Sequence, residues 1–116
     1  MRTSLIALAG LFIGGAMLVA QAPDPAKIAA GQKVFTAQKC DTCHAIAGKG
    51  GKLASALDGV GTKLPEADIR KWLANPAEME RTLPKKPAMP MSSFMKSHKL
   101  TDPDVDALTA YMLSLK

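Results

Sequence analysis

The two cysteines of this chain stand three positions apart, in the segment QKCDTCHAIAGKGGK at residues 38–52, and His44 follows the second one directly. Cysteines as close as Cys40 and Cys43 cannot join distant parts of a chain, so a framework of long-range disulfides is excluded. With 116 residues the chain has room for one small domain. Because small exported domains bury a modest fraction of their surface, they usually need disulfides, metals or cofactors to be stable.

The N-terminus has the layout of a secretory signal. A basic residue precedes an apolar run over residues 5–19, and the triplet AQA at 20–22 resembles a signal peptidase site. Pro23 would follow the cut and is unfavourable there, while the apolar run is near the lower limit for crossing a bilayer. We therefore expect residues 1–22 to be a signal peptide or an N-terminal membrane anchor, followed by an exported, periplasmic domain at 23–116.

Charge and composition limit the partners. The formal net charge is +5, and the lysines are spread along the chain rather than gathered in a run. This spacing indicates a solvated surface, with a patch that attracts an acidic partner as the alternative. Without a basic run or interleaved aromatic residues, and with export expected, the sequence argues against binding to nucleic acid.

Helical signals occur at the start and in the middle of the domain. Asp24 predicts the N-cap of a helix over residues 25–38. Gly31 inside this helix costs about 1 kcal/mol relative to alanine, so it predicts the close approach of another backbone. A second, short helix is expected over 65–75 and ended by Pro76.

The end of the chain carries the clearest helical signal. Thr101 and Asp104 form a capping-box pattern, with Pro103 in the first turn. The expected apolar face consists of Val105, Leu108, Tyr111, Met112 and Leu115. The segments 47–63 and 77–99, rich in glycine and proline respectively, are expected to be loops. Since no segment alternates as a strand, the sequence predicts an all-α domain of three to four helices with long loops.

Several chemistries can use Cys40, Cys43 and His44. A disulfide or a thioredoxin-like redox pair expects a strand–helix–strand pattern around it, which the sequence lacks. A structural zinc site needs four ligands, usually in two spaced pairs, and His98 is the only further cysteine or histidine. The pattern C-x-x-C-H favours covalent haem attachment. Two thiols one short turn apart can add to the two vinyl groups of a haem, and the histidine then lies under the iron.

The order of motifs from Ala26 to Lys116 resembles that of the class I c-type cytochromes, which are small monohaem electron carriers. The shared features are a helix with Gly31 and Phe35, the C-x-x-C-H motif, a glycine-rich loop with LDGVG, a middle helix with Trp72, a methionine–proline loop, and a last helix with LTAYMLSL. The resemblance implies a cytochrome c fold wrapped around one haem c bound through both cysteines. It also implies that the first and last helices cross at Gly31, with Phe35 and Tyr111 near the crossing.

The resemblance further implies two axial ligands to the haem iron, His44 and a methionine sulfur. Met89 is followed by proline, as is frequent in the family, whereas Met91 has an aromatic residue three positions later, which is also common. We expect Met89 to be the ligand, with Met91 as the alternative and Met95 or His98 as outsiders. His98 is expected to lie exposed just before the last helix.

Two further residues belong to the expected site. The family often has Gly-Pro where this chain has Ala54-Ser55, and the proline carbonyl accepts a hydrogen bond from the haem histidine. We expect the carbonyl of Ser55 to accept the Nδ1–H of His44 in the same way. Trp72 is expected either in the core of the middle helix or, as in the family, beside the haem with a hydrogen bond to a propionate.

These features predict a one-electron carrier and not an enzyme, since nothing else in the chain suggests catalysis. The expected partners are redox proteins of a respiratory chain or dehydrogenase, with Lys39, Lys49 and Lys52 available to attract acidic docking surfaces. One alternative is a five-coordinate haem domain that binds a small gas or acts as a peroxidase. Another is a dedicated subunit of a periplasmic dehydrogenase or terminal oxidase.

Overall fold

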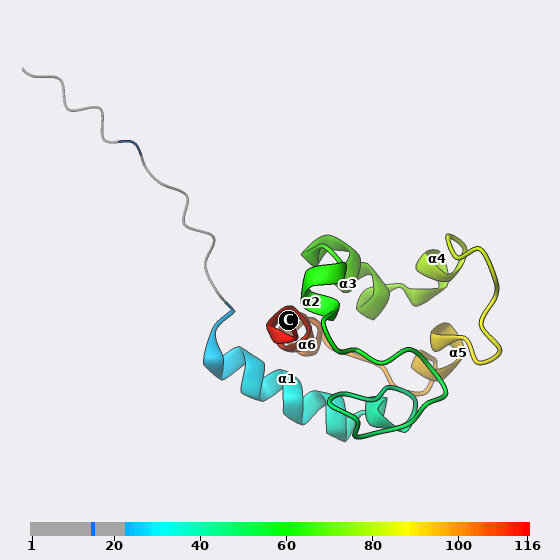
Figure 1. Cartoon of the computed structure of the whole chain (residues 1–116), viewed down its shortest axis with the longest axis horizontal. Helices are drawn as coiled ribbons and strands as arrows, with labels where there is room; N and C mark the ends of the chain where they lie inside the picture. The colour runs from blue at the N-terminus through cyan, green and yellow to red at the C-terminus, as the bar shows by residue number, and fades with distance from the viewer. Residues whose placement is uncertain (1–14, 16–22) are drawn as a thin grey trace, which may run out of the picture.

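The computed structural model describes residue 15 and residues 23–116 (Figure 1). The signal peptide or anchor expected at 1–22 therefore lies, apart from Gly15, outside the described residues. The helices are α1 (Pro25–Ala37), the 3-10 helix η1 (Cys40–Thr42), α2 (Val60–Lys63), α3 (Glu66–Ala74), α4 (Pro76–Glu80), α5 (Met91–Met95) and α6 (Asp102–Ser114). Within this part of the chain the only β-pairing is a single bridge between Ile46 and Lys49. The prediction of an all-α domain is confirmed.

The helices α1 and α6 cross in close contact, and Figure 1 shows α6 nearly end-on beside α1. Gly31 lies at the crossing, where a Cβ atom would fall 2.6 Å from the Cβ of Tyr111 and closer still to the carbonyl oxygen of Ala107. The rings of Phe35 and Tyr111 meet edge to face, with centroids 5.8 Å apart. Gly31 is therefore required by the contact between the two helices, as the sequence predicted.

The caps of the two long helices also follow the prediction. The Asp24 carboxylate accepts the N–H of Ala26 at 2.8 Å and so caps α1. At the start of α6 the Thr101 hydroxyl accepts the N–H of Asp104 at 3.3 Å, and the Asp104 carboxylate accepts the N–H of Thr101 at 3.0 Å. Both caps satisfy backbone donors that have no partner inside their helix.

The hydrophobic core is small and lies around α6. Its large buried side chains are Phe35, Ile69, Leu108 and Met112. Ile69 places α3 against α6, while α2 reaches the end of the chain through the N–H of Gly61, which donates to the carbonyl of Leu115 at 2.8 Å. No helix in the described part of the chain is both long and apolar enough to span a bilayer.

Three short helices were not predicted from the sequence. Pro76 ends α3 as expected, but it also begins α4, because its fixed φ suits a first helical turn in which its missing N–H is not needed. The segment 77–99 therefore contains most of α4 and all of α5, so its description as one long loop was wrong. The four-residue helix α2 likewise lies within the glycine-rich segment.

Replacing Gly31 with alanine tests the helix crossing. The added methyl group would collide with the backbone of Ala107, so we expect Gly31→Ala to lower the free energy of unfolding by about 1–3 kcal/mol. A decrease in stability would be informative, because by helix propensity alone alanine should stabilise the helix by about 1 kcal/mol relative to glycine. Denaturant unfolding of the holoprotein measures the change. Gln32→Ala at the exposed next position should leave stability within about 0.5 kcal/mol of wild type.

Candidate haem site

The cysteine turn, residues 39–46, brings its reactive side chains onto one tight bend. The bend closes through the carbonyl of Cys40, which accepts the N–H of Cys43 at 3.2 Å and that of His44 at 3.1 Å. Lys39 and Ala47, at its two sides, have left-handed backbone angles with φ of 60° and 51°. Both thiols therefore lie within one short turn of chain, followed by the imidazole.

The two cysteines are half-buried and are not joined by a disulfide. Burial, with a smaller effect from the charge of Asp41, raises the pKa of the Cys40 thiol. The thiol is therefore uncharged at neutral pH, as is usual for a half-buried cysteine without a neighbouring cation. No cluster of three or more histidine, cysteine, aspartate or glutamate side chains suited to a metal ion occurs among the described residues.

His44 is oriented by a hydrogen bond to the main chain. Its Nδ1 atom lies 2.7 Å from the carbonyl oxygen of Ser55, which is the contact expected from the sequence. Since a carbonyl oxygen can only accept, Nδ1 carries the proton and donates it. The other ring nitrogen, Nε2, is then left with its lone pair available to a metal, and the bond fixes the orientation of the ring.

Hydrogen bonds to the main chain fasten the glycine-rich loop to the cysteine turn, in addition to the His44–Ser55 contact and the Ile46–Lys49 bridge. The N–H groups of Gly51, Ala54 and Leu57 donate to the carbonyls of Asp41 (2.8 Å), Cys43 (3.0 Å) and Ala45 (2.9 Å). Within the loop, the N–H of Ala47 donates to the Asp58 carboxylate at 2.8 Å. A Cβ atom at Gly51 would lie 2.6 Å from the carbonyl carbon of Thr42. Sequence reasoning missed Gly51 and Asp58, since their roles depend on a backbone contact that spacing does not reveal.

The candidate methionines lie in α5 and in the loop just before it. Met89 stands in the loop before α5 with 62% of its surface exposed. Met91 and Met95 are the first and last residues of α5, and both are half-buried. In the described part of the chain no hydrogen bond joins this segment to the cysteine turn, so the structure alone does not select one sulfur.

His98 is not exposed as the sequence analysis expected. It is half-buried: its ring stacks on that of Phe94 with centroids 3.8 Å apart, and its Nδ1 donates to the carbonyl of Phe94 at 2.9 Å. These contacts hold the imidazole against the end of α5. Trp72, the other aromatic candidate, is half-buried on α3.

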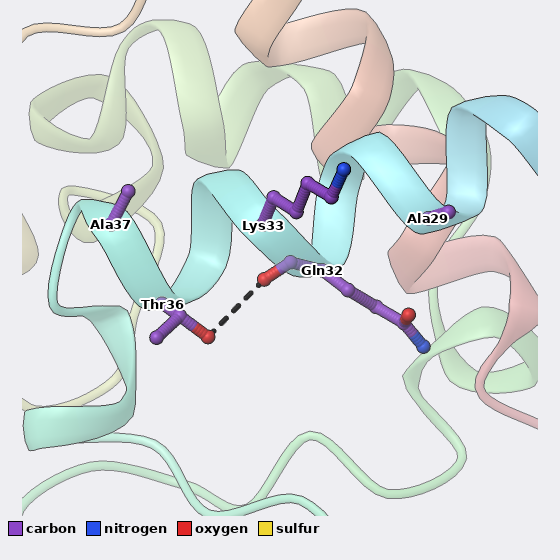
Figure 2. Close-up of a pocket in the computed structure, with 5 residues that line it drawn as sticks. All are labelled: Ala29, Gln32, Lys33, Thr36 and Ala37. Carbon is purple, nitrogen blue, oxygen red and sulfur yellow. Dashed lines mark hydrogen bonds between the residues drawn. The ribbon is translucent and has the colours of Figure 1, made fainter.

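Two surface hollows differ in their chemistry. Figure 2 shows the first, which is shallow and lies on α1, where the hydroxyl of Thr36 donates to the carbonyl of Gln32 at 3.3 Å. Its lining offers no thiol, imidazole or thioether, so it is not the site. The second lies between α3, α5 and the start of α6, and its lining combines apolar residues such as Leu73, Met95 and Leu100 with the charged residues Lys99 and Asp102.

A family model described as Cytochrome c matches residues 28–116 of the chain. The chain belongs to the cytochrome c family. This family binds haem c covalently through cysteine, and Cys40 and Cys43 are the two cysteines of the chain, so haem c is the cofactor. Searches of curated proteins and of solved structures returned no significant match.

The residues of this cytochrome fit the haem. Two neighbouring thiols and an imidazole with an available Nε2 are the donor set that the group needs. Apolar side chains that are only partly buried surround the small core and can cover a flat apolar ring; they include Ile46, Leu57, Val60, Leu64, Leu73 and Leu100. The site therefore combines two cysteines for covalent attachment, an imidazole with an available ring nitrogen, and an apolar shell.

Gly51→Ala tests whether the glycine-rich loop supports the site. The methyl group would overlap the carbonyl of Thr42, so we expect the cysteine turn to shift and the free energy of unfolding to fall by about 1–3 kcal/mol. The yield of covalently attached haem, measured by haem staining against total protein, should fall with it. Lys52→Ala, at the exposed next residue, should change neither the free energy of unfolding nor the yield of attached haem. Equal losses in both variants would contradict the supporting role of Gly51.

Proposed function

We propose that this cytochrome is an exported, periplasmic one-electron carrier that moves electrons between redox proteins of a respiratory chain or dehydrogenase. The observation that carries the proposal is the hydrogen bond from His44 Nδ1 to the Ser55 carbonyl, which leaves Nε2 available to the iron in a family that binds haem c. When bound, haem c supplies the one-electron Fe(II)/Fe(III) couple. Everything else that the function requires comes from the residues around it.

In this proposal His44 is one axial ligand, held in a single orientation. Donation from Nδ1 to a carbonyl makes Nε2 more basic and keeps the ring from turning. Because the acceptor is a backbone group on a loop fastened by hydrogen bonds to Cys43 and Ala45, the imidazole is positioned by the main chain on both sides. A fixed ligand moves little when the charge on the iron changes, which favours fast electron transfer.

We propose Met89 as the second axial ligand, with Met91 as the alternative. The thioether of Met89 is largely exposed and stands in a loop before Pro90, so few protein contacts compete for it. Met91 is half-buried at the start of α5. A thioether ligand stabilises reduced iron and raises the potential relative to a second imidazole. With both axial positions filled by protein side chains, the site carries electrons rather than activating a small molecule.

The partners in this proposal are redox proteins with acidic docking surfaces. Lys39, Lys49 and Lys52 are exposed on and beside the cysteine turn, close to where the haem is attached. Their charges would raise the rate of encounter with an acidic partner, an effect that salt weakens. Trp72 on α3 is proposed to lie beside the haem, with its indole N–H directed to a propionate.

Separate replacement of the two methionines by alanine identifies the ligand. The ferric wild-type holoprotein should be low-spin and show the weak sulfur-to-iron charge-transfer band. We expect Met89→Ala to abolish the band and to lower the reduction potential, because the thioether no longer stabilises the reduced iron. Met95→Ala is the matched control and should keep the band.

Other outcomes of this experiment are equally clear. Loss of the band in Met91→Ala alone would transfer the role to Met91. A wild-type protein that is high-spin and whose spectrum shifts with carbon monoxide would contradict electron transfer and favour the five-coordinate domain that binds a small gas or reduces peroxide.

A further inference from the structure

The carboxylate of Glu80 reaches across from α4 to the start of α5. Its two oxygens accept both donors of one residue: the N–H of Ser92 at 2.8 Å and the hydroxyl of Ser92 at 2.6 Å. Both contacts are partly shielded from water, and they are short, as hydrogen bonds to a charged group are. Glu80 is the last residue of α4 and Ser92 the second residue of α5, so this pair fastens one helix to the next.

The pair closes the segment 81–91, which has few other restraints. Most of its side chains are exposed, including those of Lys85 and Lys86. Glu80 does not use its charge on a neighbouring cation, since the ion pairs of the described residues all involve Arg70. Arg81, the adjacent cation, instead donates to the carbonyl of Ala77 at 3.3 Å. The Glu80 carboxylate therefore makes its hydrogen bonds to Ser92 and forms no ion pair among the described residues.

Both candidate methionines stand next to this anchor. Met91 immediately precedes Ser92, and Met89 lies three residues before it. On the same side, the carbonyl of Pro90 accepts the N–H groups of Ser93 at 3.0 Å and Phe94 at 3.4 Å, which closes the first turn of α5. The backbone next to both sulfurs is thus fixed by the first turn of α5 and by the contact with Glu80.

We propose that Glu80 is a positioning residue that holds the methionine on the haem iron. This inference rests on the proposed His/Met ligation but does not depend on which methionine is the ligand. A sulfur on an unrestrained loop must lose the conformational entropy of that loop each time it binds. The Glu80–Ser92 pair already restricts the loop, so less conformational entropy is lost when the sulfur binds. Binding of the methionine is thereby favoured over binding of an external ligand.

Competition with imidazole tests the proposal on the ferric holoprotein. Imidazole displaces a weakly held methionine and abolishes the charge-transfer band, so its apparent affinity reports how firmly the sulfur is held. We expect Glu80→Ala to bind imidazole about tenfold more tightly than wild type, the order expected for losing hydrogen bonds to a charged group. The reduction potential should fall in the same variant, because the thioether occupies the iron less fully.

A graded series separates positioning from general stability. Ser92→Ala removes one of the two contacts and should give an intermediate affinity for imidazole. Glu80→Gln keeps a carbonyl for the Ser92 N–H and an amide N–H for its hydroxyl but loses the charge, so its affinity for imidazole should lie between those of wild type and Glu80→Ala. Glu78→Ala on the same helix and Ser93→Ala beside Ser92 are matched exposed controls and should bind imidazole as wild type does.

The outcomes are distinguishable. If the wild-type protein shows the band and Glu80→Ala and Ser92→Ala bind imidazole as wild type does, the positioning role is wrong while the proposed function stands. Lower stability of these variants at unchanged affinity and potential would also overturn it, because the pair would then be structural only. If the wild-type protein lacks the band, the proposed function itself fails.

Discussion

The contact of α1 with α6 at Gly31 is the constraint on which the rest of this cytochrome depends. The two helices approach so closely that no side chain fits between the backbone of Gly31 and that of Ala107. This approach brings Phe35 and Tyr111 into an edge-to-face pair, which adds about 0.5–1.5 kcal/mol beyond the area that the rings bury. Since α1 leads directly into the cysteine turn, the crossing also sets where the haem is attached.

Around this crossing the protein alone buries little. Its core has four large side chains, whereas many others are half-buried around it. A domain of this size is marginal when it relies on its own core. A bound haem would therefore contribute to the fold as well as to the chemistry, because the partly buried apolar side chains around the core can pack against its ring. Stability and redox function share the same side chains in this protein.

The sequence predicted the features that rest on local chemistry or on one special residue. The caps by Asp24 and Thr101 depend only on residues of their own helix. Glycine destabilises a helix, so its presence at position 31 indicated a close contact with another backbone. The carbonyl at Ser55 was anticipated from the family resemblance, since a serine can supply the same backbone acceptor as the family's proline. The short helices α4 and α5 could not be predicted, since helices of five residues exist only through tertiary contacts such as that between Glu80 and Ser92. His98 was misjudged because its ring packs back on Phe94 four residues earlier, a local contact that depends on the turn after α5.

Lys39 and Ala47, the two non-glycine residues with positive φ in the described part of the chain, stand at the two sides of the cysteine turn. A left-handed backbone costs a residue with a Cβ roughly 1–2 kcal/mol. The polypeptide thus stores conformational strain on either side of the cysteines, and the hydrogen bonds between the turn and the glycine-rich loop hold the backbone in this conformation. At these two positions glycine, which usually weakens a fold, would relieve strain rather than create it.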